Sequence, residues 1–568
     1  MRNLRSTSDL ILEKIPPLVT WALILFPIWG GFIYPNGAAY IILTLNIYFL
    51  YRSISITILL LIAVVKLRES ESINWLNRLY EIDNISGAIQ NLKAEKLLIQ
   101  SGSKIVESTE FKNESLNKVI KNRVPLFLLN LISKIEKGKA IKFINQEIKR
   151  LEYLQKFGIV YDWKNIRHVI IIPHWKEPFH ILKETIERIR QTNYPTHNIS
   201  IVLAAEARDP EGIAFSELLK KEYEQYFDNI WINKHELKSN ELVGKSSNMR
   251  SASTYAYQQI MKLNWDLKLT TVTSCDADSQ LPEDYFSNTT YLYVTTKDSE
   301  YKYFTGAVLL HANIWKLPFF ARVKNSMSSL YNLTRLMRED KLIPFSTYTL
   351  SFWLIKEIDF WTPNITPEDY HTFFKGLFMF PNKTSTVPIF QRIMADAAEG
   401  DNALDTARNN YLQERRWAWG VSDDGWMIKN LLIKTFTGKA TIRMIYIVLH
   451  ALWDHMSIGI SVLVTFGSNL IVLVNPRFSY TVVGANLPAI SSFLIQLTLL
   501  FFVFTVLLDS YIKPQPKGKK NLIQKFFGFF EWFLQPFVGT ILVVLPGIEA
   551  HTRLLFGKYL EYYLTKKK

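Results

Sequence analysis

The 568-residue sequence contains a single cysteine, Cys275. One thiol cannot form an internal disulfide framework, and it cannot supply the ligands of a cysteine-based zinc module. Small disulfide-rich secreted domains are therefore excluded. Aromatic residues are plentiful, with 36 Phe, 27 Tyr and 15 Trp, so the chain has enough bulky apolar side chains to exclude intrinsic disorder.

Charged side chains are missing from several long stretches. They are absent from residues 15–51, 53–65, 455–476, 478–508 and 532–548. A helix needs about 20 apolar residues to cross the hydrocarbon layer of a membrane. We therefore predict four crossings, at residues 16–34, 38–65, 457–475 and 481–508. The sequences Pro35-Asn36-Gly37 and Asn475-Pro476 supply the turns between the paired crossings.

The fifth charge-free stretch, 532–548, is interrupted by Pro536 and Pro546. It could cross the membrane, dip in and return, or lie in the interface. A signal peptide is the alternative for the first stretch. We disfavour it because a second apolar run follows within three residues and no small-residue cleavage site is evident.

Basic residues flank the predicted crossings. Residues 66–160 hold 17 Lys and Arg against 11 Asp and Glu, and residues 509–568 hold ten against four. Basic loops stay in the cytoplasm, so we expect an integral protein of the cytoplasmic (plasma) membrane with its middle region on the cytoplasmic side. This orientation favours an even number of crossings, with 532–548 interfacial or re-entrant. Anionic lipid headgroups explain the excess charge, and no nucleic-acid motif appears, so we expect no nucleic-acid partner.

The middle of the chain alternates between strand and helix patterns. Apolar runs predict strands at 169–173, 199–205, 229–233 and 269–275. Helical patterns lie between them at 178–191, 211–226 and 246–262. Repeated strand–helix units imply an α/β fold with a mostly parallel sheet covered by helices. We divide the chain into two crossings (1–66), a helical cytoplasmic collar (67–160), a catalytic domain (161–440) and interfacial and transmembrane helices (441–568).

Polar side chains follow the predicted strands, where parallel sheets bind ligands. Glu177, Glu206 and Lys245 lie in three of these loops, and Asp276 and Asp278 leave the fourth strand. Two carboxylates at this spacing could bind Mg²⁺ or Mn²⁺, which would neutralise a substrate diphosphate. A solvated turn is the alternative for an isolated Asp-x-Asp sequence.

Two further clusters lie closer to the carboxy-terminal crossings. Glu368 and Asp369 could include a general base, although acids also favour the first turn of a helix. Gln413, Arg416 and Trp417 combine an arginine with an aromatic ring, which suits a diphosphate and a stacked sugar. The alternative is an aromatic belt at the membrane interface.

Taken in order, these clusters resemble those of the membrane-embedded family-2 glycosyltransferases, which include the cellulose, chitin and hyaluronan synthases. The Gln-x-x-Arg-Trp element is complete, and the 44 residues from Asp369 to Gln413 match the family's spacing. The resemblance covers about 166–430 by motif and the remainder by layout. It implies a GT-A-like catalytic domain with helices on both faces of the sheet, joined to α-helical membrane segments.

On the donor side, the resemblance implies a role for each acid and for the lysine. Glu177 and Glu206 would contact the uracil and ribose of a UDP-sugar; many relatives have Asp at the second position, one methylene shorter. Lys245 would meet the nucleotide. Asp276 would hold the ribose or the metal, and Asp278 would ligate the metal, which is Mg²⁺ or Mn²⁺.

On the acceptor side, Asp369 would be the catalytic base and Glu368 would support it. Gln413, Arg416 and Trp417 would line the acceptor end and steady the diphosphate. The resemblance therefore implies an inverting, metal-dependent hexosyltransferase that acts in polysaccharide biosynthesis.

The sequence leaves the acceptor open. The chain could extend and export a growing glycan, or add one sugar to a lipid-linked acceptor. Four or five crossings make a small channel for a glycan, so a second copy of the chain or an export partner could supply more. A non-catalytic membrane scaffold that keeps the fold is a third reading.

Overall fold

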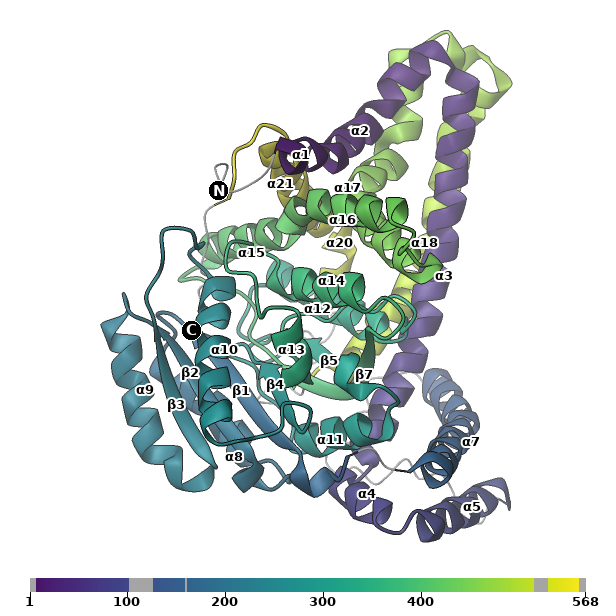
Figure 1. Cartoon of the computed structure of the whole chain (residues 1–568). Helices are drawn as coiled ribbons and strands as arrows, with labels where there is room; N and C mark the ends of the chain where they lie inside the picture. Colours follow the sequence, from purple (N-terminus) through teal and green to yellow (C-terminus); the bar gives the residue numbers. More distant parts are fainter. Residues whose placement is uncertain (1–6, 102–125, 159–160, 515–529, 561–568) are drawn as a thin grey trace.

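The computed structural model describes residues 7–101, 126–158, 161–514 and 530–560. A unit of strands and helices lies at one end of the molecule, and long apolar helices extend away from it (Figure 1). Shorter helices, among them α14, α15 and α16, lie between the sheet and the long helices. Their bounds are Glu368–Met379, Ala403–Ala418 and Asp424–Phe436.

Seven strands form one sheet in the order β3-β2-β1-β4-β6-β5-β7. Their bounds are β1 Arg167–His174, β2 Ile199–Glu206, β3 Asn229–His235, β4 Thr270–Ser274, β5 Lys302–Leu309, β6 Tyr348–Ser351 and β7 Ser385–Met394. The first four strands are parallel to one another, and β7 is parallel to β5. Only β6 runs antiparallel to both strands that it pairs with. The prediction of an α/β fold with a mostly parallel sheet is confirmed.

Helices cover both faces of this sheet. They are α8 Phe179–Arg190, α9 Pro210–Tyr223, α10 Lys245–Lys262, α11 Tyr285–Thr295, α12 Phe319–Arg335 and α13 Phe352–Glu357. Ile170 and Ile172 of β1 belong to a buried core with α8, α9 and α11. Val169 and Ile171, which point the other way, belong to a second core with α10 and α13. Burial on both faces explains why β1 reads as an uninterrupted apolar run.

Three helices that lie between α3 and β1 along the chain correspond to the region predicted as a collar. They are α4 Trp75–Ile82, α5 Ile85–Ser101 and α7 Leu126–Phe157. Trp75 packs on Tyr291 of α11 with ring centroids 5.4 Å apart. The Tyr291 hydroxyl donates to the Glu147 carboxylate of α7 over 2.6 Å. These contacts attach α4 and α7 to the core of the sheet unit.

Within the described residues, five segments are long and apolar enough to cross a membrane, judged by length and composition alone. They are Thr7–Ile33, Pro35–Ser72, Ile442–Val474, Val482–Ile512 and Glu531–Leu555. The first contains α2 (Ile15–Ile33), and the next three are α3, α17 and α18. The chain is therefore a candidate membrane protein.

The apolar helices α2 and α3 form one hairpin and α17 and α18 form another. The two hairpins pack side by side, with α2 parallel to α17 and α3 parallel to α18. At the turns, the Asn475 side-chain amide donates to the Gly31 carbonyl over 2.9 Å. Gly459 allows the close approach of α17 to α2, because a Cβ there would lie 2.8 Å from the Thr20 carbonyl oxygen. The turn between α2 and α3 and the turn between α17 and α18 both lie at the end of these helices that is remote from the sheet (Figure 1).

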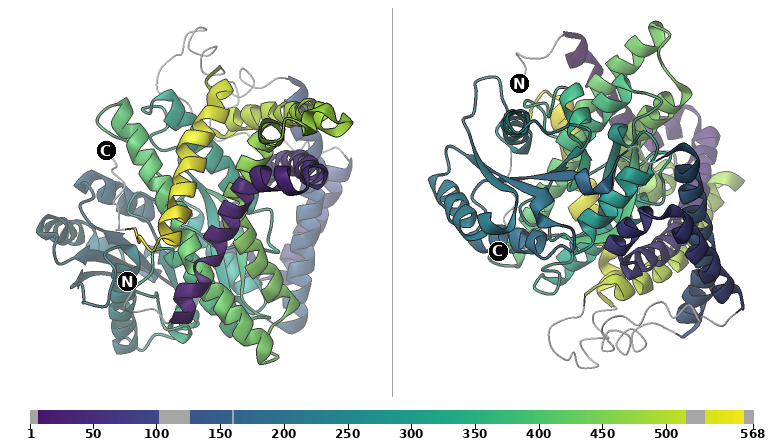
Figure 2. Two further views of the ribbon diagram at one scale, coloured as in Figure 1. Left: turned by 90° about the horizontal axis from the view of Figure 1, so that it is seen from above. Right: turned by 60° about the horizontal axis from the view of Figure 1, so that its bottom comes forward.

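The fifth segment, Glu531–Leu555, packs against α12 and α15 and ends in α21 (Leu545–Leu555). Seen from above, it runs as a yellow helix beside the green α15 (Figure 2). Glu549 accepts from Arg415 over 2.6 Å and from Tyr411 over 2.8 Å. The length and composition of this segment suit a membrane crossing, whereas its contacts through Glu549 attach it to α15. The interfacial or re-entrant placement of residues 532–548 stays a prediction.

Candidate active site

One cavity of about 520 Å³ opens at the carboxyl ends of β1, β2 and β4. Such strand ends are where parallel sheets bind ligands. Every candidate site residue lines it: Glu177, Glu206, Lys245, Asp276, Asp278, Glu368, Asp369, Gln413, Arg416 and Trp417. Parts of α12, α15 and α17 complete the wall. The fold therefore brings all of these side chains, from distant parts of the sequence, to one site.

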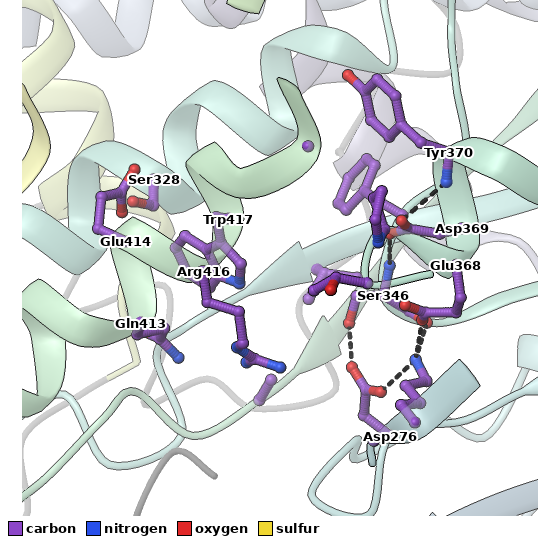
Figure 3. A pocket seen from close by; sticks show the side chains of 18 of the residues that line it. Asp276, Ser328, Ser346, Glu368, Asp369, Tyr370, Gln413, Glu414, Arg416 and Trp417 are labelled. Atoms are coloured by element: carbon purple, nitrogen blue, oxygen red, sulfur yellow. Dashed lines mark hydrogen bonds and ion pairs between the residues drawn. The ribbon is translucent and has the colours of Figure 1, made fainter. Parts of the chain in front are cut away.

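Two groups face each other across this cavity (Figure 3). One group, on α15, holds Gln413, Arg416 and Trp417. The other holds Asp276, Glu368 and Asp369, and Arg416 extends from α15 toward the side of the cavity where Asp276 lies. This arrangement leaves room for a diphosphate between an arginine and a set of acids.

Lys245 lies at the centre of the acidic group. Its ammonium is 2.6 Å from Asp276 Oδ1 and 2.9 Å from Glu368 Oε1. Burial alone would lower the pKa of Lys245, but these two carboxylates hold it well above its usual value. Burial raises the pKa of Glu368, and Lys245 opposes that rise. Gly244, with a φ of 150°, provides a backbone conformation that favours glycine immediately before Lys245 begins α10.

Ser346 connects the two acids on which the chemistry would depend. Its hydroxyl donates to Asp276 Oδ2 over 2.5 Å, and its backbone N–H donates to Asp369 Oδ2 over 3.2 Å. The backbone N–H of Tyr370 donates to the other Asp369 oxygen over 2.8 Å. Ser346 has a φ of 58°, a strained value for a residue with a side chain. This strained turn fixes the carboxylate of Asp369 at the edge of the cavity.

The far end of the cavity combines acids with a flat aromatic surface. Glu206 Oε1 lies 3.2 Å from Nδ1 of His235, whose Nε2 lies 2.9 Å from the Glu241 carboxylate. Burial would lower the pKa of His235, but the two carboxylates raise it. The guanidinium of Arg208 lies 4.5 Å from the centre of the Trp175 ring. A planar base and a ribose match such a surface and its neighbouring carboxylates.

Trp417 is supported from behind by a buried lysine. The Lys324 ammonium lies 4.3 Å from the centre of the Trp417 ring, 3.1 Å from Glu414 Oε2 and 3.5 Å from Gln413 Oε1. Burial lowers the pKa of Lys324, although Glu414 opposes that effect. Trp417 itself is 42% exposed, so one face of the ring is open to the cavity. A sugar ring could stack on it.

A buried pair of aspartates lies behind Asp369. His371, two residues after Asp369, has its Nδ1 2.9 Å from Asp423. The neighbouring Asp424 lies 2.6 Å from Nδ1 of His455 on α17, and burial raises the pKa of Asp424 to about 6. These contacts connect the helix that carries Asp369 to a candidate membrane span.

The residues at the end of β4 suit a divalent cation that is shared with a substrate. Asp276 and Asp278 offer oxygen ligands to the cavity, and Asp278 is oriented by a hydrogen bond from the Asp396 N–H over 2.9 Å. In the described ranges there is no cluster of three or more His, Cys, Asp or Glu arranged as a metal site. Mg²⁺ often takes only one or two carboxylates and completes its shell with substrate phosphates. The donor set therefore fits a metal that binds together with a diphosphate.

The structure adds residues that no motif indicates. Ser346, Lys324 and Arg335 lie in segments without a recognisable pattern, and their roles arise only from contacts formed on folding. His235 is different because it ends β3 at the same edge as Glu206. The rule that placed Glu206 at the site could have found it.

No model of a known protein family matches the sequence, and no curated protein does. Among solved structures, mannosyltransferase PcManGT from Pyrobaculum calidifontis in complex with GDP-Man and Mn²⁺ is 13% identical over 61% of this chain and 85% of that chain, with a TM-score of 0.38. S. aureus TarS 1–349 in complex with UDP-GlcNAc is 10% identical over 57% of this chain and 92% of that chain, with a TM-score of 0.29. Likeness at this level does not carry function.

Proposed function

We propose that this chain is an inverting glycosyltransferase that moves a sugar from a nucleotide-sugar to a growing polysaccharide at the membrane. Uridine diphosphate is the carrier that we favour. The observation that carries the proposal is the convergence of the candidate residues, from six separate segments, on one cavity at the carboxyl edge of the sheet. Residues that were only solvated turns, helix starts or an interfacial belt would have no reason to meet there.

Donor binding would use the sheet side of the cavity. Glu177 and Glu206 would contact the base and ribose beside Trp175, and Lys245 would meet the nucleotide. Lys245 already balances two carboxylates, so it would keep the acidic group neutralised while the diphosphate enters. Asp278, with Asp276, would hold Mg²⁺ or Mn²⁺, which supplies positive charge that stabilises the leaving diphosphate.

Transfer would proceed by attack of an acceptor hydroxyl on the anomeric carbon. The bond between that carbon and the diphosphate oxygen breaks, and its electron pair leaves with the nucleotide. Asp369 accepts the hydroxyl proton as the new bond forms, with Glu368 in support. Because the hydroxyl attacks from the face opposite the leaving diphosphate, the anomeric configuration inverts. A general base contributes roughly 10²–10⁴-fold to such a step, and the remainder comes from positioning and charge stabilisation.

Acceptor binding would use the α15 side, where Trp417 offers a stacking face and Gln413 and Arg416 lie beside it. The cavity wall includes Ile458 of α17, so an acceptor could reach the membrane helices directly. We propose that the catalytic domain faces the cytoplasm, because it lies opposite the two short turns of the helical hairpins. Transfer of one sugar to a lipid-linked acceptor is the second candidate, favoured by this same contact with α17.

Full-length protein purified in detergent tests the proposal with a panel of UDP- and GDP-sugars, with Mg²⁺ or Mn²⁺ and with membrane lipid extract as the acceptor source. We expect release of the free nucleoside diphosphate from one donor and a glycosylated product of measurable length. Polymer would support the first candidate, and one sugar per lipid would support the second. No release of nucleotide from any donor under either metal would contradict the proposal and favour a scaffold.

A further inference from the structure

One face of α12 lines the cavity. Ser328, Tyr331, Asn332 and Arg335 all belong to the cavity wall, and their spacing of three and four residues places them on one side of the helix. Arg335 is the last residue of α12, so its side chain lies where the helix ends and the loop toward Ser346 begins.

Arg335 brings a cation into the cavity without a carboxylate partner. Its guanidinium lies 4.5 Å from the centre of the Phe345 ring, and Nη2 donates to the Ile343 carbonyl over 3.2 Å. Within the described ranges, no carboxylate oxygen lies within the 4.0 Å ion-pair distance of its nitrogens. Lys245, by contrast, is paired with two acids. A guanidinium has five N–H donors, so most of the hydrogen-bonding capacity of Arg335 remains for a ligand.

The position of Arg335 points to the acceptor rather than the donor. Phe345, on which it stacks, directly precedes Ser346, whose N–H holds the carboxylate of Asp369. The acids whose charges act on Arg335 are Asp369 and Asp454, and Asp454 belongs to α17, a candidate membrane span. An anion bound here would therefore lie beside the base, on the side of the candidate membrane helices.

Two apolar residues of candidate membrane spans, Ile458 and Val543, also line the cavity. Asp454 and Ile458 are four residues apart on α17 and both line the cavity, so they share one face of that helix. Val543, from the segment Glu531–Leu555, also lines the cavity. A ligand could therefore place an anionic group at Arg335 and continue along apolar side chains of two candidate membrane spans.

We propose that Arg335 binds the phosphate of a lipid-linked acceptor, whose apolar chain leaves the cavity past Ile458 and Val543. A guanidinium suits this role because it binds phosphate oxygens through paired hydrogen bonds. The inference rests on the proposed glycosyltransferase function and specifies its acceptor: the sugar that is extended, whether one unit or a growing glycan, is carried on a lipid phosphate. A glycan that presents a uronate carboxylate to Arg335 is the competing source of the anion.

Binding of defined probes to the full-length protein in neutral detergent tests this assignment. The probes are geranylgeranyl phosphate, geranylgeraniol, inorganic phosphate and a glucuronate-containing tetrasaccharide. We expect the wild type to bind geranylgeranyl phosphate roughly tenfold or more tightly than the alcohol, a preference equivalent to one charge-assisted contact. Arg335→Gln should abolish that preference, and Arg335→Lys should retain part of it, since lysine keeps the charge but not the paired geometry.

Arg338→Gln is the matched control, because Arg338 lies one turn further on, pairs with Asp340 over 2.8 Å and is outside the cavity wall. It should keep the wild-type preference. If Arg335→Gln does not fold, the partial loss in Arg335→Lys carries the test.

Three results would overturn the assignment. These are an unchanged phosphate preference in Arg335→Gln, equal binding of inorganic phosphate and the lipid phosphate, or tighter Arg335-dependent binding of the tetrasaccharide. Loss of UDP binding in Arg335→Gln would also overturn it, by moving Arg335 to the donor site. Failure of the wild type to bind or cleave any nucleotide-sugar would instead contradict the proposed function, so the two failures are distinguishable.

Discussion

Replacing Lys245 with methionine would remove the cation that lies between Asp276 and Glu368. The lysine side chain is 16% exposed and Glu368 is 11% exposed, while Asp276 is 29% exposed to the cavity. Removing one partner of a buried ion pair costs about 3–5 kcal/mol, because the remaining charge is left uncompensated. Since water can reach Asp276, we expect the lower end, about 3 kcal/mol. For a domain of this size that corresponds to a fall in Tm of roughly 6–12 °C.

The loss should depend on pH. Burial raises the pKa of Glu368, and Lys245→Met removes the cation that opposes this rise. An acid whose pKa is higher in the folded protein than in the unfolded chain does not lower the free energy of unfolding at a pH below its unfolded pKa. It lowers that free energy increasingly as the pH rises from the unfolded pKa toward the folded pKa. The Tm deficit of the variant should therefore be larger at pH 8 than at pH 5.5. Adding Glu368→Gln should restore most of the Tm at pH 8.

Thermal unfolding followed by tryptophan fluorescence in detergent measures these changes. Lys262→Met is the matched control, because Lys262 ends the same helix and is exposed. Its Tm should differ little from that of the wild type. Equal losses in the two variants, or a deficit in Lys245→Met that ignores both pH and Glu368→Gln, would refute the view that Lys245 neutralises two acids.

Two further substitutions test the metal and acceptor sides of the cavity. In the presence of Mg²⁺ or Mn²⁺, Asp278→Ala should weaken binding of the nucleotide-sugar by at least the roughly 10–100-fold that is typical of lost metal-site interactions. Titration with and without the metal measures this loss. An unchanged metal dependence would count against the metal site. Trp417→Ala should lower transfer to the acceptor more than hydrolysis of the donor, whereas Trp417→Phe keeps a stacking face and should retain more transfer. Equal loss of both activities in Trp417→Ala would make the residue structural.

Of the four strands that the sequence predicted, β1, β2 and β4 are buried on both faces, and β3 is partly exposed. β1 extends over Arg167–His174, around the predicted 169–173, because its apolar run serves two cores. β5, β6 and β7 were not predicted. β6 has only four residues, Tyr348–Ser351, and it exists because it pairs with β4 on one side and β5 on the other. Such a short strand has no periodicity of its own to detect.

The long helices show a similar limit. The crossing predicted at 38–65 is part of a helix that continues to Ser72, through charged residues such as Lys66 and Glu71. The charge-free pattern marks the end of the apolar run at residue 65. It does not mark the end of the helix, because the charged residues that follow are also helical. Arg392 of β7 pairs with Glu71, so a tertiary contact stabilises the helix beyond the apolar run.

At the site, residues within motifs could be named from the sequence, whereas the residues that hold them could not. Asp369 follows a recognisable pattern, but Ser346, which donates to it, lies on a turn whose strained φ is fixed by the surrounding fold. Lys324 has no distinguishing pattern around it in the sequence, and only folding buries it behind Trp417. Contacts that hold a site residue in place, such as those of Ser346 and Lys324, depend on tertiary packing and leave no motif in the sequence.

The measurement that bears most directly on the central claim is the rate of sugar transfer by Asp369→Asn, together with its affinity for the nucleotide-sugar. The amide keeps an oxygen that can accept from Ser346 or Tyr370, so the fold and the donor site should persist. We predict that transfer falls by roughly 10²–10⁴-fold while donor affinity stays nearly unchanged. Transfer at the wild-type rate in Asp369→Asn would contradict the assignment of Asp369 as the base.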